Sequence, residues 1–183
     1  DQPRSRGLGD VYKRQELNIM NVRGETDLPD SVLERLDIAI ASIHMPCFKA
    51  ERTIDNVTAA YEKVMEHPYV DIIGHPDDGR FPVDMKRLVK KAKETGTLLE
   101  VNNSSLRPEG FRENTKENCL EMVKECKAHG VMIVLGSDSH VDADIAEYPY
   151  AEEILRETDF PEKLVANVSL EKLKACIKHG KKL

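Results

Sequence analysis

The sequence predicts an α/β fold built on a parallel sheet, and three features indicate it. Short apolar runs rich in Ile, Val and Leu alternate along the chain with stretches of helical periodicity. The apolar runs are continuous, as in strands that are buried on both faces. Reactive polar residues directly follow several of these runs. Strict alternation of strand and helix indicates βαβ units, so we expect one domain with its strands in sequence order.

The expected elements follow one another with short connections. The apolar runs predict strands at Glu16–Met20, Leu36–Ile43, Val70–Gly74, Thr97–Val101 and Val131–Leu135, with a further short run at Leu164–Val168. Helical spacing predicts helices at Thr53–Glu66, Val83–Thr95, Thr115–His129, Ala146–Glu157 and Leu170–His179. Gly96, Gly130 and Gly180 stand where C-terminal caps belong, and Ser169 is a typical N-cap.

Residues 1–15 differ in character from the rest. They carry Arg4, Arg6, Lys13 and Arg14 without any apolar period. We interpret them as a non-native segment, so that the fold begins at Glu16; a short basic targeting arm is the alternative.

The overall composition is that of a globular protein of 183 residues, 40% hydrophobic and 33% charged. No apolar run in it reaches membrane length, and we expect no secretory leader. A net charge of -6 argues against nucleic-acid binding by bulk electrostatics. The four cysteines, Cys47, Cys119, Cys126 and Cys176, form no C-x-x-C pair, which predicts reduced thiols in a cytoplasmic protein.

Several polar residues share one location, the carboxyl end of a predicted strand. They are His44, His75, Asn102, Asn103, Asp138 and His140. Active sites of parallel α/β proteins lie at this edge of the sheet. The remaining histidines, His67, His129 and His179, lie instead at helix ends, where a cation has an ordinary electrostatic role.

Imidazole and carboxylate groups at corresponding strand ends predict a metal site for zinc, manganese or iron. Asp138 and His140 are two residues apart, so an extended turn would point both to one side. A single strand-end histidine is more often a core or capping side chain, and it is the combination that favours metal. By its position alone, Glu16 reads as an exposed glutamate.

Five motifs occur in a recognisable order. They are Glu16–Ile19 (ELNI), Ile43–Pro46 (IHMP), Ile72–Pro76 (IIGHP), Leu99–Ser105 (LEVNNSS) and Gly136–His140 (GSDSH). This series resembles the PHP (polymerase and histidinol phosphatase) family, above all its stand-alone bacterial phosphatases. The stretches Asp159–Glu162 and Asn167–Ser169 are similar to that branch too.

The resemblance implies a distorted seven-stranded (β/α) barrel that holds up to three divalent metal ions, with zinc foremost and manganese or iron as alternatives. It also implies that Glu16 bridges two metals and that His44, His75, Asp138 and His140 are further ligands. The family's first-strand His-x-His pair and the two histidines after it have no counterpart here. A complete barrel needs roughly 250 residues. We therefore expect residues 16–183 to be the C-terminal two-thirds of a PHP domain, lacking the first two strands.

The function implied is hydrolysis of a small phosphomonoester by a water that clustered metals activate. Asn102, Arg107, Arg112 and Lys116 lie in the loop after the fourth strand and are candidates for binding the substrate phosphate, as is Arg80. Asp77 and Asp78 are expected to form a turn.

Two alternatives remain open. One is a PHP-type 3'-5' exonuclease, although the sequence lacks the interleaved aromatic and basic residues of a single-strand binder. The other is a metal-binding fragment without turnover, because ligands are missing; for the same reason we expect the chain as given to have low or no activity. An incomplete barrel would also expose a strand edge through which copies could associate.

Overall fold

A computed structural model describes residues 14–178 of the chain. Most of the predicted non-native segment, together with His179 and Gly180, lies outside the described residues. The first strand begins at Arg14, two residues before the predicted start of the fold at Glu16.

The structure has a five-stranded parallel sheet in the order β1-β2-β3-β4-β5, which confirms the predicted sheet type and strand order. Its strands are β1 (Arg14–Asn18), β2 (Ile38–Ser42), β3 (Ile72–Ile73), β4 (Leu98–Asn102) and β5 (Ile133–Gly136). The register pairs Glu16 with Ile40 and Asn18 with Ser42. All carboxyl ends therefore meet at one edge of the sheet.

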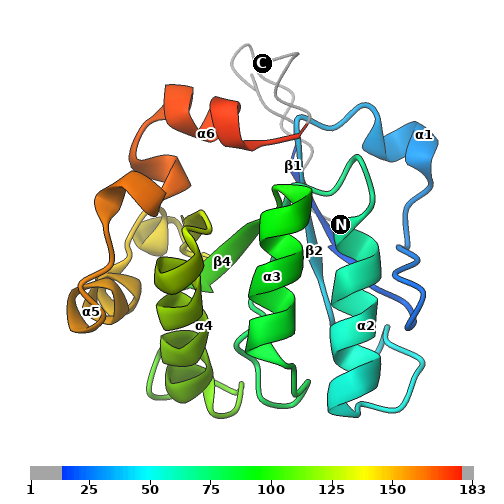
Figure 1. Ribbon diagram of the computed structural model, residues 1–183, viewed down its shortest axis with the longest axis horizontal. Coiled ribbons are helices and arrows are strands. Elements are labelled where there is room, and N and C mark those ends of the chain that lie inside the picture. The colour runs from blue at the N-terminus through cyan, green and yellow to red at the C-terminus, as the bar shows by residue number, and fades with distance from the viewer. Residues whose placement is uncertain (1–13, 179–183) are drawn as a thin grey trace.

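Three helices stand side by side over one face of this sheet (Figure 1). They are α2 (Ile54–Met65), α3 (Met85–Thr95) and α4 (Thr115–His129). Thr53 caps α2 by accepting a hydrogen bond from the amide of Asn56, and Gly96 and Gly130 end α3 and α4 in the left-handed conformation. The predicted boundaries of α4 and both glycine caps are confirmed.

The remaining elements depart from the prediction in detail. The structure adds a short helix, α1 (Asp30–Leu33), and a 3-10 turn, η1 (Asp142–Asp144). The expected run Leu164–Val168 is not a strand but two 3-10 turns, η2 (Glu162–Leu164) and η3 (Ala166–Val168). Its Val165 makes a single isolated bridge to Ile133. The last two helices are α5 (Pro149–Glu157) and α6 (Leu170–Cys176), with Ser169 capping α6 as predicted.

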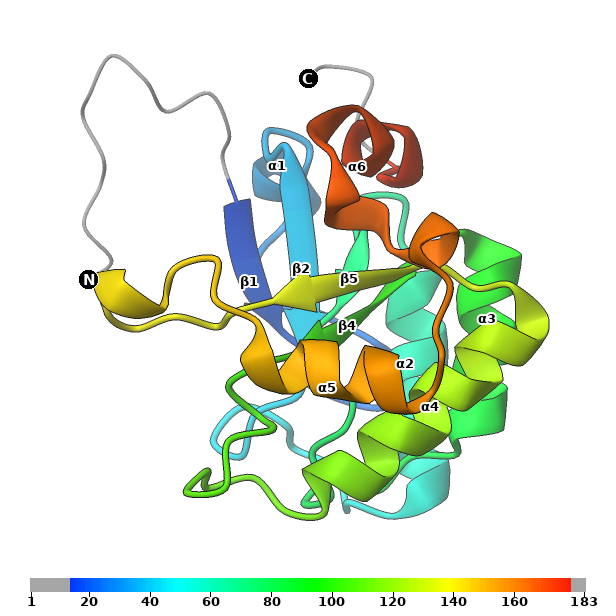
Figure 2. The ribbon, with the colours of Figure 1, turned by 90° about the vertical axis from the view of Figure 1, so that its left-hand side faces the viewer.

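The strand side chains alternate between two apolar clusters. Leu17, Ile73 and Leu99 belong to the larger one, with the buried faces of α2, α3 and α4. Ile38, Ile72 and Leu98 face the opposite way and pack with Ile177 of the C-terminal segment. Helix α6 lies across the amino ends of the strands, so this second face is covered at that end (Figure 2).

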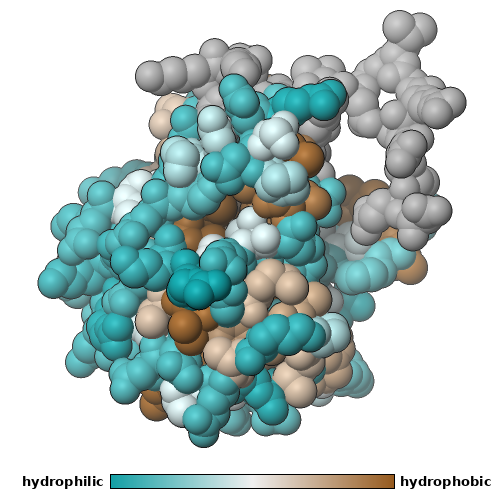
Figure 3. All heavy atoms as spheres, turned by 90° about the vertical axis from the view of Figure 1, so that its right-hand side faces the viewer, coloured by the Kyte–Doolittle hydropathy of each residue, from teal (hydrophilic) through white to brown (hydrophobic). Residues whose placement is uncertain are grey.

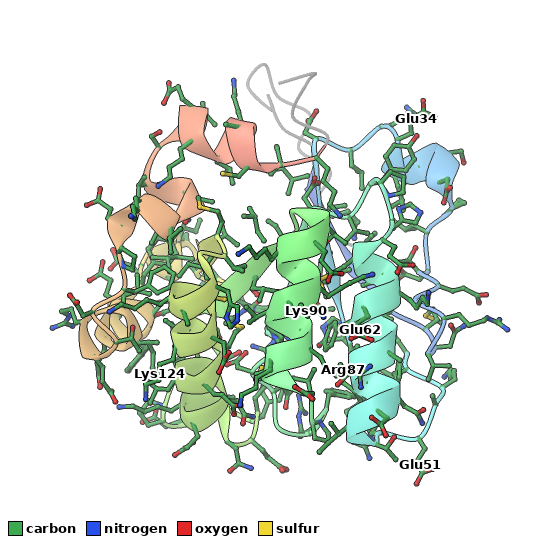
Figure 4. All side chains as sticks on the ribbon, viewed as in Figure 1. Glu34, Glu51, Glu62, Arg87, Lys90 and Lys124 are labelled. Carbon is green, nitrogen blue, oxygen red and sulfur yellow. The ribbon has the colours of Figure 1, made fainter. Side chains whose placement is uncertain are left out.

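The outer surface of the helices is polar and carries ion pairs. Arg87 on α3 points toward Glu62 on α2, with 2.7 Å between Nη2 and Oε2 (Figure 4). The side of the molecule shown in Figure 3 is mainly hydrophilic, with hydrophobic residues in smaller groups. All four cysteines are free, as predicted. In the part of the chain that is described, no helix combines the length and apolar character needed to span a membrane.

Candidate metal centre

Three of the predicted ligands converge at the carboxyl edge of the sheet. Nε2 of His75 lies 3.2 Å from Nε2 of His44 and 3.2 Å from Oε1 of Glu16. Nε2 of His44 lies 3.5 Å from the same Glu16 oxygen. Within residues 14–178 this is the group of His, Cys, Asp and Glu side chains whose donor atoms are close enough together to hold one ion.

The sheet brings these residues together from three neighbouring strands. Glu16 is the third residue of β1, while His44 and His75 each come two residues after the last residue of β2 and β3. Glu16 pairs in register with Ile40, whose side chain packs on the second apolar face. The carboxylate therefore points to that face, beneath the two histidines.

His75 has a φ of 33°, in the left-handed region that non-glycine residues seldom adopt. Its backbone N–H donates to Oε2 of Glu100 at 2.8 Å, and Nδ2 of Asn102 donates to the same oxygen at 3.1 Å. Glu100 lies in the middle of β4 and is almost fully buried. Its carboxylate thus fixes the backbone conformation that carries the His75 ring into the cluster.

His44 is held from the other side of its ring. Its Nδ1 lies 2.7 Å from Oδ1 of Asn18, the last residue of β1. Asn18 is in turn bound by Asp27, which accepts from the Asn18 backbone N–H at 2.9 Å and from Nδ2 at 2.6 Å. Metal-binding histidines typically have such a partner on the second ring nitrogen.

The charges in the cluster favour the protonation states that bind metal. Burial alone would raise the pKa of Glu16, but hydrogen bonding to His75 and the charges of both imidazoles lower it to about 2. Burial, together with the charge of His75, lowers the pKa of His44, although Glu16 opposes the shift. An ionised carboxylate beside a neutral imidazole is the donor set that a divalent cation requires.

A hollow of about 280 Å³ opens beside the cluster on the second face of the sheet. Its lining includes polar side chains, those of Glu16, Glu100, Asn102 and Asp138, and apolar side chains such as that of Ile72. Asp138 therefore lies in the same hollow as Glu16. Its donor atoms are not part of the tight cluster of Glu16 and the two histidines.

The turn after β5 is not extended as expected. Asp138 has a φ of 47°, in the left-handed region, which breaks the two-residue alternation of an extended strand on which the prediction depends. Oδ2 of Asp138 pairs with Nη2 of Arg112 at 3.2 Å. His140 is exposed, and its Nδ1 lies 3.1 Å from the Asp138 carbonyl oxygen. The ligand roles of Asp138 and His140 stay predictions.

The candidate phosphate-binding residues are distributed over the rim. Arg112 is nearly buried and donates to Oγ of Ser105 at 2.7 Å and to Oδ1 of Asn102 at 3.3 Å. Arg107 pairs with Asp144, and Lys116 pairs with Glu153 and Glu157 on α5. Arg80 pairs with Asp78 and lies over the ring of the exposed Phe111.

Several residues around the cluster were not among those predicted from the sequence. Glu100 is the one charged residue in the buried strand sequence LLEVN. A charge in such a strand is the sequence feature that could have identified Glu100. Asp77 lies in a turn, as predicted, but it is also fully buried, and neither carboxylate oxygen has a hydrogen-bond partner among residues 14–178. Burial raises the pKa of Asp77 to about 7. No local pattern distinguished Asn18 or Asp27.

The donor set fits a divalent transition metal. Two imidazole nitrogens and one carboxylate oxygen converge, and both histidines have backbone or ring contacts that fix their orientation. Mixed nitrogen and oxygen donors suit zinc, manganese and iron. Glu16, His44 and His75 are thus the residues that could hold such an ion.

Similar sequences are found among curated proteins. A probable phosphatase of Clostridium novyi (strain NT) is 45% identical over 168 residues, which cover 92% of this chain and 68% of that protein. A probable phosphatase of Thermoanaerobacter sp. (strain X514) is 38% identical over 94% of this chain and 70% of that protein. A probable phosphatase of Acetivibrio thermocellus is 40% identical over 93% of this chain and 69% of that protein. No protein-family model matches the chain. With this identity over more than two thirds of each relative, the chain belongs to the family of these probable phosphatases.

Proposed function

We propose that this protein is a metal-dependent phosphomonoesterase of the PHP type, which acts on a small phosphorylated substrate. The convergence of Glu16, His44 and His75 at the carboxyl edge of a parallel sheet is the observation that carries the proposal. The relatives' description as probable phosphatases supports the reaction class. The metal dependence is inferred from the donor set, and the PHP type from the ordered motifs.

The residues of the chain divide the task between binding the metal and binding the phosphate. Divalent ions in such a site supply Lewis-acid chemistry, polarising a phosphoryl oxygen and lowering the pKa of a bound water. Glu16 offers an ionised carboxylate, because its pKa is lowered to about 2. Asp138, at the rim of the same hollow, is a candidate for a further ligand.

Arg112 is the candidate that best suits a phosphate group among the predicted cations. Its guanidinium reaches Asp138 and Asn102, both of which line the hollow beside Glu16. A planar guanidinium can donate two hydrogen bonds to one phosphate. Lys116 pairs instead with two glutamates of α5, which do not line this hollow. We therefore propose Arg112, ahead of Arg107 and Lys116, as the residue that binds the substrate phosphate.

The test is metal content and turnover measured on the same samples. Protein stripped with a chelator and reloaded with zinc or manganese should hydrolyse a generic aryl phosphate slowly, because the family's ligand set is incomplete here, and the stripped protein should not hydrolyse it. His75→Ala should lose both bound metal and turnover. His129→Ala is the matched control, because His129 is exposed at the end of α4 and pairs with Glu125 of the same helix.

Three outcomes separate this proposal from its rivals. Equal turnover with and without metal would contradict metal dependence. Metal binding without any turnover would indicate the metal-binding fragment without activity. Release of nucleotides from single-stranded DNA, with no action on the aryl phosphate, would indicate an exonuclease.

A further inference from the structure

Asn18 and Asp27 form a hydrogen-bonded pair behind His44, and neither has a role in the proposed reaction. Asn18 ends β1, and Asp27 lies in the loop between β1 and α1. The backbone of the two residues is also paired, since the Asp27 N–H donates to the Asn18 carbonyl oxygen at 3.2 Å. The Asp27 carboxylate accepts from the backbone N–H and from the side-chain amide of Asn18.

The loop that carries Asp27 is anchored to the rest of the fold. Ile19 and Thr26 form an antiparallel bridge across it, and Gly24 at its turn has a φ of 73°. A β carbon at Gly24 would lie 2.5 Å from the backbone nitrogen of Val64 on α2. The close packing of this turn on α2 holds Asp27 at a set position beside Asn18.

The chemistry of these groups allows one orientation of the Asn18 amide. A carboxylate only accepts hydrogen bonds, so the NH₂ group of Asn18 must face Asp27 and its oxygen must face His44. An amide oxygen also only accepts, so the nitrogen that faces it, Nδ1 of His44, must carry the hydrogen. In a neutral imidazole the other nitrogen then has the free lone pair. That nitrogen is Nε2, which points to Glu16 and His75.

We propose that Asp27, acting through Asn18, is a positioning residue that sets the tautomer of His44 so that the lone pair of Nε2 faces the metal centre. The consequence for metal binding rests on the proposed function. The tautomer itself does not, because it is a property of the metal-free protein.

The structure predicts opposite effects for a single and a double substitution. In Asp27→Asn the new amide oxygen still accepts from the Asn18 backbone N–H, so its NH₂ group faces the Asn18 side chain. Asn18 must then turn its oxygen toward residue 27 and its own NH₂ group toward His44. Nδ1 of His44 becomes the acceptor, and the hydrogen moves to Nε2. Adding Asn18→Asp restores an acceptor opposite Nδ1, and with it the original tautomer.

Nitrogen NMR of isotope-labelled, metal-free protein at about pH 8, where histidine is ordinarily neutral, reads the tautomer directly. We expect His44, assigned by the loss of its signals in His44→Gln, to carry its hydrogen on Nδ1 in the wild type. It should carry it on Nε2 in Asp27→Asn and on Nδ1 again in the Asn18→Asp, Asp27→Asn double variant. Asp30→Asn is the matched control, since Asp30 contacts the ring of His67, at 3.2 Å, and should leave His44 unchanged.

Zinc affinity gives a second readout of the same pair. Asp27→Asn should weaken zinc binding about 10-fold, the lower end of the roughly 10–100-fold loss seen when the partner of a metal-bound histidine is removed. The double variant should recover most of that loss. A wild-type His44 with its hydrogen on Nε2, or a tautomer that Asp27→Asn leaves unchanged, would overturn the proposal. A wild type with the expected tautomer but no zinc affinity would contradict the proposed function and leave the assignment of Asp27 and Asn18 intact.

Discussion

Gly136 on β5 faces the carboxylate of Glu100 on β4 so closely that a β carbon at position 136 would overlap Oε1 of Glu100. The same carboxylate accepts the backbone N–H of His75 through its other oxygen. The absence of a side chain at position 136 therefore gives Glu100 the space in which it supports a residue of the candidate metal centre. The φ of Gly136 is outside the left-handed region, so space rather than backbone conformation explains this glycine.

Gly136→Ala is therefore expected to displace Glu100 and to lower the free energy of unfolding by about 1–3 kcal/mol, the usual cost of overpacking a buried site. Urea denaturation measures this cost, and it should shrink when Glu100 is also replaced by Ala. Equal costs of Gly136→Ala in the two backgrounds would show that Gly136 and Glu100 are not coupled.

Replacement of Glu100 should depend on whether an acceptor for the His75 amide remains. Glu100→Ala leaves a buried N–H without a partner and should cost about 1–3 kcal/mol of stability. Glu100→Gln keeps an oxygen that can accept this N–H and should cost less. Glu100→Ala should also weaken zinc binding more than Glu100→Gln does, because the left-handed backbone of His75 would relax without this hydrogen bond. Equal zinc affinity in the two variants would refute a positioning role for Glu100.

Arg112 and Lys116 offer a comparison between a buried and an exposed cation. The Arg112 side chain is only 9% exposed and bonds to Ser105 and Asp138, whereas Lys116 is 51% exposed. Arg112→Leu should lose about 1.5–3 kcal/mol, because it removes hydrogen bonds to a charged, partly buried group. Lys116→Leu should change stability by less than about 1 kcal/mol, as for other exposed ion pairs. If urea denaturation showed similar losses of stability for the two variants, the hydrogen bonds of Arg112 would contribute no more than the ion pairs of Lys116.

The cysteines should react in two classes. Burial raises the pKa of Cys126 to about 12 and that of Cys119 well above its ordinary value. Only the thiolate reacts with iodoacetamide, and a group with a pKa of about 12 stays protonated as the pH rises from about 7 to 9. In the folded protein, alkylation should therefore modify Cys47 and Cys176 and spare Cys119 and Cys126 throughout that range. Peptide mapping checks this, with denatured protein as the control in which all four react.

The sequence alone determined the class of fold and part of the candidate site. Continuous apolar runs between helices specify strands buried on both faces, and their alternation with helices specifies parallel pairing. Once the strands are parallel, residues that follow successive strands must meet at one edge. His44 and His75 could be predicted as neighbours for this reason.

Only the tertiary structure decided the contacts that depend on backbone reversals and on residues distant in the sequence. Because Asp138 has a left-handed φ, the turn is not extended, and the extended geometry that would point Asp138 and His140 to one side is lost. No periodicity along the chain reveals such a change of backbone conformation. Glu100 and Gly136 come from different strands, and their contact exists only because β4 and β5 pair in one register. Asp27 reaches Asn18 because Gly24 packs its loop onto α2. A pattern along the chain records which face a residue occupies, whereas hydrogen-bond partners depend on how separate elements are packed together.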